Sequence, residues 1–427
     1  MRILFIDQNF DASNIGGAFK SNYAIINEII KNTNFKISVL ATKTYQKVGE
    51  RFSSKQIRPV LRFPSKKLNR LLKYLKINKY FSFFPIIREI DKFKPNIIIV
   101  QRDLAISAII AAFLKKIPII HIIRDAMEFC PKDIDTRGFI NCTSPLSKEE
   151  CWECINEWRT LRILLDDKPK GSNTTFKSSL YTTYYKIQYY FTKLHAYLIK
   201  FAWINIVASP SMKSLIKKRA KNARVIVRKI TPIETFKMEI SGKSLEKQVF
   251  DRIENSNKNI LFVIPRNEGG SKGYPFVKKM LNSFPNDYLL IVVGTILEEL
   301  KTYQNIINLD KVPTETLYYL YQKGNLTIVP SIYTEAFGRV VLESLINGTP
   351  VIVSPQTSAN YLFRDKKYVK ILPLKIPFWL EEIKNFIDNQ INIPEEDIEQ
   401  IKNNFSPEEC ANELLKVINK IHFNNIS

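Results

Sequence analysis

The sequence is poor in histidine and has no long uninterrupted apolar segment. Three histidines occur among 427 residues, which disfavours a catalytic zinc held by several imidazoles. The longest apolar stretch, residues 104–114, is stopped by Lys115 and Lys116 and is too short to cross a bilayer. The apolar run before Asp7 is far shorter than the core of a secretory signal. We therefore expect a cytoplasmic protein without a membrane-spanning segment.

Acidic residues are scarce in the first half of the chain. Residues 1–230 contain 42 Lys and Arg against 17 Asp and Glu, whereas residues 231–427 contain 22 against 24, so the net charge of +23 lies entirely in the first half. Such a field attracts an anionic membrane or a nucleic acid. Because none of the recognised nucleic-acid reader motifs is present, we expect no nucleic-acid partner, and nucleic-acid binding is the weaker alternative.

The densest basic part of the chain, residues 51–94, includes an amphipathic segment. Lys66–Lys79 places leucines at helical spacing on one face and cations on the other, and three phenylalanines follow at Phe81, Phe83 and Phe84. This pattern is typical of a basic helix that docks on anionic lipid. It is equally typical of a surface helix that packs its leucines on a sheet. Both interpretations stay open, and the first predicts peripheral association with the inner face of the membrane.

Alternating apolar strands and helical segments predict an α/β protein with two doubly wound parallel sheets. We place the first domain at residues 1–230, a connector at 231–258, the second domain at 259–406 and a terminal segment at 407–427. A Cys-rich insertion is expected at about 126–160. The expected strands lie near 2–6, 36–41, 96–100, 117–123 and 204–208, and then near 260–264, 289–293, 306–309, 326–329 and 351–354.

The most informative segment is Pro330–Ser354. The apolar strand 326–329 opens into a loop carrying Glu335, and a helix begins near Gly338 with Glu343 inside it. Such loops at the carboxyl ends of parallel strands bind ligands, and the free amides of a helix start favour a diphosphate. Two carboxylates beside that anion are better suited to accept hydrogen bonds from sugar hydroxyls. On spacing alone, a capped helix with two surface acids is an equal alternative.

This segment closely resembles the C-terminal signature of retaining glycosyltransferase family 4, whose members have the GT-B fold. Residues 2–6 resemble the family's first strand, and Gly16-Gly17 lies in a stretch similar to the glycine loop after it. Residues 260–266 followed by Lys272-Gly273 resemble the opening of the second domain. The resemblance implies two Rossmann-like domains that face each other across a cleft. It also implies a last helix, from about residue 407 to 422, that returns toward the first domain.

The resemblance assigns three residues to catalysis. Arg266 and Lys272 would neutralise the departing diphosphate, because charge develops there as the glycosidic bond breaks. Glu335 would bind hydroxyls of the transferred sugar. Retention in this family is explained by attack from the front face without an enzyme nucleophile, so none is expected. No cofactor is required for catalysis.

The resemblance assigns further residues to binding of the donor. Glu343 would bind the ribose of a UDP- or GDP-sugar, and amides near Phe337 and Gly338 would face its phosphates. Gly16 and Gly17 would let the first domain approach those phosphates when the cleft closes. The acceptor is expected to be a glycan or a lipid-linked molecule.

The chain departs from the family pattern after the strand near 117–123. Where the family commonly has His-Asp, this sequence has Arg124-Asp125, with His121 three positions earlier. Arg124 is a candidate for binding a phosphate or a sugar hydroxyl, and Asp125 is a candidate for orienting the acceptor. A helix cap or a turn is the alternative role for Asp125. His121 lies in an apolar strand and is expected in the core.

Four cysteines occur close together in the expected first domain, where they resemble the Cys-rich insertion that a subgroup of family 4 carries. They are Cys130, Cys142, Cys151 and Cys154, and the last two form a Cys-x-x-Cys pair. Disulfides are unlikely in a cytoplasmic chain, so the choice is between unlinked thiols and a closed, structural zinc site. Both remain open.

These observations predict a retaining, metal-independent glycosyltransferase that moves a hexosyl group from a nucleotide sugar to a lipid-linked or saccharide acceptor, in cell-surface glycan synthesis. The alternative is an inactive nucleotide-sugar-binding or scaffold protein. Against this alternative, both glutamates of the signature are present together with Arg266 and Lys272.

Overall fold

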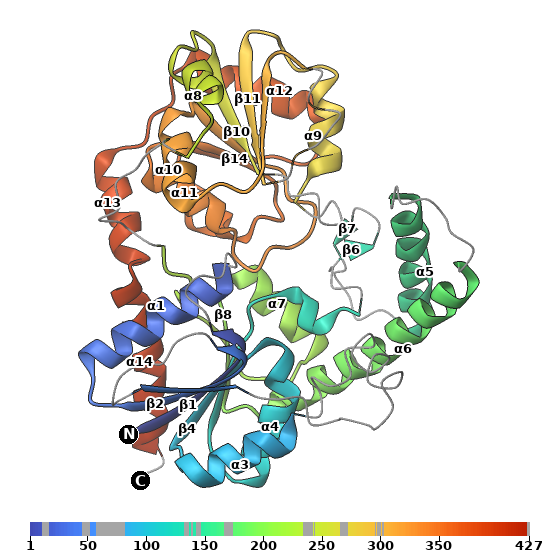
Figure 1. The fold of residues 1–427 in the computed structure, drawn as a ribbon, viewed down its shortest axis with the longest axis vertical. Coiled ribbons are helices and arrows are strands. Elements are labelled where there is room, and N and C mark those ends of the chain that lie inside the picture. The colour runs from blue at the N-terminus through green and yellow to red at the C-terminus, as the bar shows by residue number, and fades with distance from the viewer. Residues whose placement is uncertain are drawn as a thin grey trace. The chain divides into compact units, whose positions relative to one another are not determined.

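The computed structural model describes most of the chain as two compact units (Figure 1). The first contains most of Met1–Pro232 together with Pro407–Ser427, and the second consists mainly of Ile233–Ser406. The sequence-based boundaries lie at 230 and 406. The described residues, to which all statements below refer, are 1–10, 17–44, 52–56, 82–131, 136–137, 140–141, 147–165, 174–233, 242, 244–264, 272–294, 296, 300 and 303–424.

A parallel sheet forms the centre of the first unit, with strand order β3-β2-β1-β4-β5-β8-β9. All five strands expected from the sequence are present, and β3 and β9 extend the sheet at its edges. The central strands are short apolar runs, which suit a sheet that is buried on both faces. The strands are β1 Arg2–Phe10, β2 Lys36–Thr44, β3 Phe52–Gln56, β4 Ile97–Gln101, β5 Ile119–Ile122, β8 Ile204–Val207 and β9 Val225–Val227.

Helices cover both faces of this sheet. Helix α3 packs against α4, and α1 packs against α14. Helices α5 and α6 lie at the end of the Cys-rich stretch and project away from the sheet (Figure 1). The α-helices are α1 Gly17–Asn32, α3 Phe83–Phe93, α4 Ala105–Leu114, α5 Lys148–Leu165, α6 Thr174–Leu198, α7 Pro210–Arg219 and α14 Pro407–Asn424. The short elements are η2 Arg102–Leu104, η3 Ala126–Phe129, η4 Ile199–Phe201 and the pair β6 Thr136–Arg137 and β7 Ile140–Asn141.

The terminal helix α14 belongs to the first unit although the second unit precedes it in sequence. Its apolar residues Leu414, Ile418 and Ile421 are at most 1% exposed. Their spacing of four and three residues places them on one helical face, which explains why this stretch folds as a helix against α1.

A second parallel sheet forms the centre of the second unit, with strand order β12-β11-β10-β13-β14-β15. The five expected strands are again present, and β15 is an additional edge strand. The strands are β10 Asn259–Val263, β11 Tyr288–Val293, β12 Ile306–Leu309, β13 Leu326–Val329, β14 Val351–Val353 and β15 Val369–Ile371. The α/β class with doubly wound parallel sheets is therefore confirmed.

Helices α9 and α12 cover one face of the second sheet, and α10 and α11 cover the other (Figure 1). Trp379 on α12 is fully buried and packs edge-to-face on Phe276 of α9. The helices are α8 Lys247–Glu254, α9 Tyr274–Leu281, α10 Thr314–Lys323, α11 Arg339–Ile346, η7 Ser358–Leu362, α12 Ile376–Asp388 and α13 Glu395–Asn404. Helix α8 lies within the segment that the sequence suggested as a connector, and it is part of the second unit.

Within the described residues, no helix combines the length and the apolar character needed to cross a bilayer. The amphipathic segment Lys66–Lys79 and Phe81 lie outside these residues. Phe83 and Phe84 are the first residues of α3, and Phe84 is 68% exposed.

Candidate functional site

The order of strands in the second unit fixes where a ligand site is expected. The chain passes from β10 to β11 on one side and later returns to β13 on the other side of β10. In open α/β sheets, ligands bind outside the carboxyl ends of the strands at such a reversal. Lys272 follows β10, and Glu335 follows β13. Lys272 and Glu335 therefore lie at the same edge of the sheet, one as a cation and the other as a carboxylate.

Lys272 and Glu335 form an ion pair at this edge. Their Nζ and Oε1 atoms are 2.8 Å apart, and the side chains are 27% and 7% exposed. The hydroxyl of Ser331 donates to the same carboxylate oxygen. Burial opposes the charge on Lys272, but Glu335 and the phenol oxygen of Tyr333 outweigh it and hold the pKa of the ammonium above its usual range. Lys272 therefore stays charged at physiological pH.

Gly273 brings the two loops into contact. Its φ is +89°, and a Cβ added there would lie 2.1 Å from the carbonyl oxygen of Pro330. Any side chain would push the loop after β10 away from the loop after β13. This close approach explains why the Lys-Gly pair lies beside the Glu335 loop.

Helix α11 begins directly after that loop, as expected from the sequence. Gly338 precedes its first residue with φ +95°, and a Cβ there would lie 2.8 Å from Thr357 Cγ2 and 3.3 Å from Glu335 Oε2. The first amides of the helix therefore start beside the Glu335 carboxylate, in the orientation that favours an anion. Phe337 is 5% exposed, and its ring contacts Phe405, so its side chain serves packing.

Glu343 lies one turn inside α11 and pairs with Arg339. The Oε1 and Nη2 atoms are 3.1 Å apart, and the two side chains are 13% and 18% exposed. The neighbouring Tyr321 is completely buried, and its hydroxyl makes no hydrogen bond within the described residues. Burial and the Glu343 carboxylate raise the pKa of this phenol. Sequence reasoning did not identify Arg339, Tyr321 or Ser331, although two of them lie in or beside the signature segment.

Arg266, the second expected cation, lies outside the described residues, as does Gly16. Gly17 is the first residue of α1. The proposed contact of the glycine loop with phosphates stays a prediction.

Arg124 is held by other groups of the first unit. Its Nη1 atom donates to the carbonyl of Ile230 over 2.5 Å, its Nη2 atom to Asn22 over 2.8 Å, and its Nε atom to Gln101 over 3.3 Å. Asn22 and Gln101 in turn donate to the fully buried carboxylate of Asp7. Arg124 thus joins β1, α1 and β4. Its expected contact with a ligand, and that of the half-buried Asp125, stay predictions.

The cysteines give no metal cluster among the residues that the structure describes. Cys142 lies outside them. Cys130 and Cys154 are buried, and Cys151 at the start of α5 is half-buried. Within the described ranges, the single set of three potential ligand atoms that converge is formed by other residues, which are treated below. The four-cysteine zinc site stays a prediction.

The second unit matches a known protein family, and the fold resembles that of solved structures. Residues 245–404 match the family model for glycosyl transferases group 1. No curated protein gives a significant sequence match. Sucrose-phosphate synthase from Thermosynechococcus elongatus has a similar structure, with a TM-score of 0.63 at 13% identity over 99% of each chain.

Two further structures extend this likeness. HepE from Anabaena, in complex with UDP and glucose, gives a TM-score of 0.59 at 14% identity, covering 98% of this chain and 100% of that chain. The lipopolysaccharide outer core galactosyltransferase WaaB gives 0.58 at 13% identity, covering 100% of both chains. Likeness at such identities establishes the fold, and this chain has the α/β GT-B architecture.

Proposed function

We propose that this protein is a glycosyltransferase that moves a hexosyl group from a nucleotide sugar to an acceptor, with retention of configuration. The observation that carries the proposal is the Lys272–Glu335 pair at the strand reversal of the second sheet. An ammonium that is charged at physiological pH, beside a carboxylate and a helix start, matches a ligand that combines a diphosphate with a hydroxyl-rich ring. The match of residues 245–404 to group 1 glycosyl transferases supports the same substrate class.

In the proposed reaction, the positive charge faces the leaving group. The diphosphate gains negative charge as the bond to the sugar breaks, so a cation fixed in place stabilises the transition state more than the ground state. Lys272 supplies this charge together with Arg266, and these side chains take the place of a metal ion. The pair with Glu335 holds the pKa of Lys272 above its usual range and holds the ammonium 2.8 Å from the carboxylate.

The two glutamates recognise different parts of the donor. Glu335, which pairs with the Lys272 ammonium, binds the transferred sugar in this proposal by accepting hydrogen bonds from ring hydroxyls. Glu343 is further along α11 and accepts from the ribose hydroxyls. Before the donor binds, Ser331 and Arg339 satisfy these carboxylates. The nucleotide is UDP or GDP, and UDP is favoured because the similar HepE structure contains UDP.

The acceptor is proposed to be lipid-linked or a saccharide in the synthesis of a cell-surface glycan. The positive charge of residues 1–230 supports an anionic acceptor or an acceptor at an anionic surface. The similar fold of the lipopolysaccharide galactosyltransferase is consistent with this class.

A binding experiment tests the donor site and separates the roles of the glutamates. Thermal shifts are measured with UDP, GDP and a panel of their sugars, because a ligand that binds the native state raises its melting temperature. The expected result is that one nucleotide sugar stabilises the protein more than its nucleotide does. Glu335→Ala should abolish this difference, whereas Glu343→Ala should weaken both ligands. A wild-type protein that is stabilised by none of the panel contradicts the proposal.

A turnover experiment separates an enzyme from a binding or scaffold protein. Release of the nucleoside diphosphate is followed with saccharide and lipid-linked acceptors, and the anomeric configuration of the product is determined. Transfer with retained configuration and an unchanged rate after brief chelation is expected. Stabilisation by a nucleotide sugar without release for any acceptor supports the inactive binding protein instead.

A further inference from the structure

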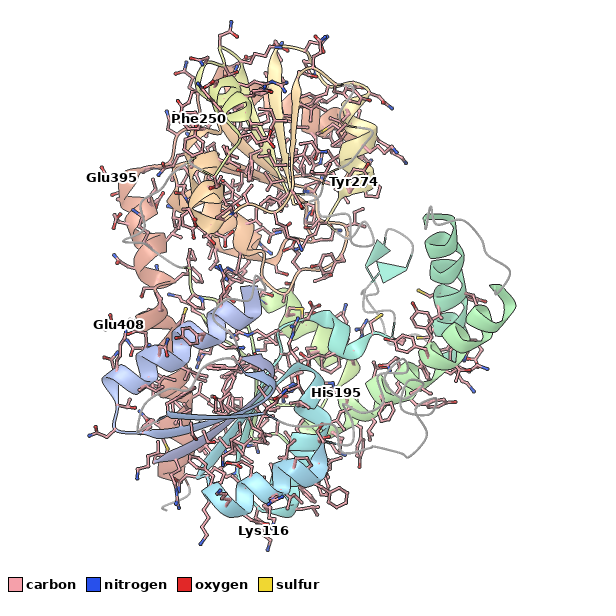
Figure 2. The ribbon with its side chains drawn as sticks, in the orientation of Figure 1. Lys116, His195, Phe250, Tyr274, Glu395 and Glu408 are labelled. Atoms are coloured by element: carbon pink, nitrogen blue, oxygen red, sulfur yellow. The ribbon has the colours of Figure 1, made fainter. Side chains whose placement is uncertain are left out.

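Two of the three histidines converge with a glutamate inside the first unit. His121 on β5 lies with its Nε2 atom 3.1 Å from Oε2 of Glu128 on η3, and Nε2 of His195 on α6 lies 3.8 Å from the same oxygen. The exposed fractions of the side chains are 0%, 8% and 6% in that order. Figure 2 labels His195 near the end of α6, where this helix reaches the sheet. Three residues that are far apart in sequence thus place their polar atoms in one buried space.

The other ring nitrogen of each histidine has a partner that fixes its proton. Nδ1 of His121 lies 3.0 Å from Oδ1 of Asn205. The amide nitrogen of Asn205 donates to the carbonyls of Ile199 and Arg224 over 2.9 and 3.0 Å, so its oxygen must face the histidine as an acceptor. Nδ1 of His121 therefore carries the proton in the neutral ring.

The same argument holds for His195. Its Nδ1 atom lies 3.2 Å from the main-chain carbonyl oxygen of Glu128, which can only accept. In the neutral form of both rings, each Nε2 atom then directs a lone pair toward the Glu128 carboxylate. Two lone pairs and an anion in a buried space repel one another unless a positive charge lies between them.

A metal ion supplies that charge in the geometry that the residues already have. Histidines that ligate metals commonly donate their other ring N–H to a carbonyl or a carboxylate, as both do here. Ligand atoms about 2.0–2.1 Å from a tetrahedral zinc stand about 3.3 Å apart, and the two observed separations of 3.1 and 3.8 Å bracket this value. The second carboxylate oxygen of Glu128 is buried and has no hydrogen-bond partner within the described residues.

We propose that His121, Glu128 and His195 bind a divalent metal ion of the zinc type. Two imidazoles and one carboxylate suit zinc better than magnesium or calcium, which prefer oxygen ligands. Three protein ligands leave one position for a water molecule. The site ties β5, η3 and the long helix α6 together. It also anchors both ends of the segment from His121 to Glu128, which contains Arg124 and Asp125.

This role is independent of the donor site. The ligands all belong to the first unit, whereas Lys272 and Glu335 belong to the second. Metal content and nucleotide-sugar binding are therefore separate readouts, and the failure of one proposal leaves the other standing.

Metal analysis of the full chain is the first test. Protein purified without chelators, loaded with zinc and freed of loosely bound metal should retain about one zinc per chain. His195→Ala and Glu128→Gln should each lower the zinc affinity by at least 100-fold. His422→Ala removes the third histidine of the chain and is the matched control, which should retain the metal. Thermal shifts with nucleotides report on the folded second unit in every variant.

Cobalt substitution distinguishes this site from the cysteine cluster. Cobalt held by imidazoles and a carboxylate lacks the intense near-ultraviolet band that thiolate ligands produce. We expect a cobalt spectrum without this band, and we expect that the Cys151→Ser/Cys154→Ser variant keeps it unchanged. A wild-type protein without bound metal overturns the proposal. Metal that survives in His195→Ala but is lost in the double cysteine variant overturns it as well.

Discussion

Replacing Lys272 by alanine should slow transfer without dismantling the second unit. The change removes the one described cation at the strand reversal that pairs with Glu335. Loss of a single preorganised electrostatic group at a developing charge typically lowers kcat by about 10²–10³-fold, or about 2.7–4 kcal/mol of transition-state stabilisation. The assay is release of the nucleoside diphosphate under saturating donor. The fall should appear in kcat more than in KM, because the ground state carries less charge on the leaving group.

The same substitution should have a smaller effect on folding. It leaves the Glu335 carboxylate, which is 7% exposed, with the hydroxyl of Ser331 as its remaining side-chain partner among the described groups. A lost hydrogen bond to a charged group costs about 1.5–3 kcal/mol of unfolding free energy. Urea unfolding, which reports this free energy directly, should show a loss in that range.

Lys323→Ala is the matched control. Lys323 and Glu254 form an ion pair of 2.7 Å in the same unit, but their side chains are 38% and 31% exposed. An exposed pair contributes about 0–1 kcal/mol, so this variant should have near-native stability and turnover. If Lys272→Ala and Lys323→Ala lowered kcat equally, the effect would come from the loss of one positive charge and not from the position of Lys272. A normal kcat in Lys272→Ala would refute the assignment of this residue to the leaving group.

Further predictions concern the nucleotide, the loop contact and the membrane. Glu343→Ala should raise the dissociation constant of the nucleotide with little change in kcat, because ribose contacts are similar in the ground and transition states; calorimetry with the nucleotide checks this. Gly273→Ala should lower the free energy of unfolding by more than 3 kcal/mol, because its Cβ meets the carbonyl of Pro330. Gly348→Ala has a similar positive φ but open space around the new Cβ, so it should cost about 1–2 kcal/mol in the same urea titration. Charge reversal within Lys66–Lys79 should abolish salt-sensitive co-sedimentation with anionic liposomes and leave nucleotide binding intact; co-sedimentation that persists would contradict lipid docking. The residues to reverse are Lys66, Lys67, Arg70 and Lys73.

The strands that the sequence predicted are those with continuous apolar runs. β4 and β11 consist almost entirely of buried aliphatic residues. Such continuous apolar runs are typical of strands in a parallel sheet that is covered on both faces. The edge strands β3, β9 and β15 were missed for a physical reason, whereas the apolar edge strand β12 was predicted. β3 reads Phe-Ser-Ser-Lys-Gln and buries one residue clearly, because an edge strand has one neighbour and tolerates polar side chains. β9 and β15 are three residues long, which is below the length at which alternation can be recognised.

The proposed donor-site residues Glu335 and Glu343 lie in one short signature, and Lys272 was proposed because it lies in the Lys-Gly pair after an expected strand. Lys272 and Glu335 are separated by 63 positions, but strand order brings them together, and that order follows from the βαβ pattern. No motif or strand end in the sequence indicated that His195 belongs to a metal-binding cluster. It lies within a long polar helix, and its meeting with His121 and Glu128 depends on where α6 packs, which sequence periodicity does not specify.

The terminal helix α14 has a consequence for how the protein is made. Because α14 completes the first unit and follows the second unit in sequence, the first unit cannot close until the second unit has been synthesised. The second unit is contiguous and can fold while synthesis continues. The apolar face that receives Leu414, Ile418 and Ile421 stays uncovered until residues 407–424 have left the ribosome. A nascent chain that stalls within the second unit therefore exposes that face, and chaperones are expected to bind there.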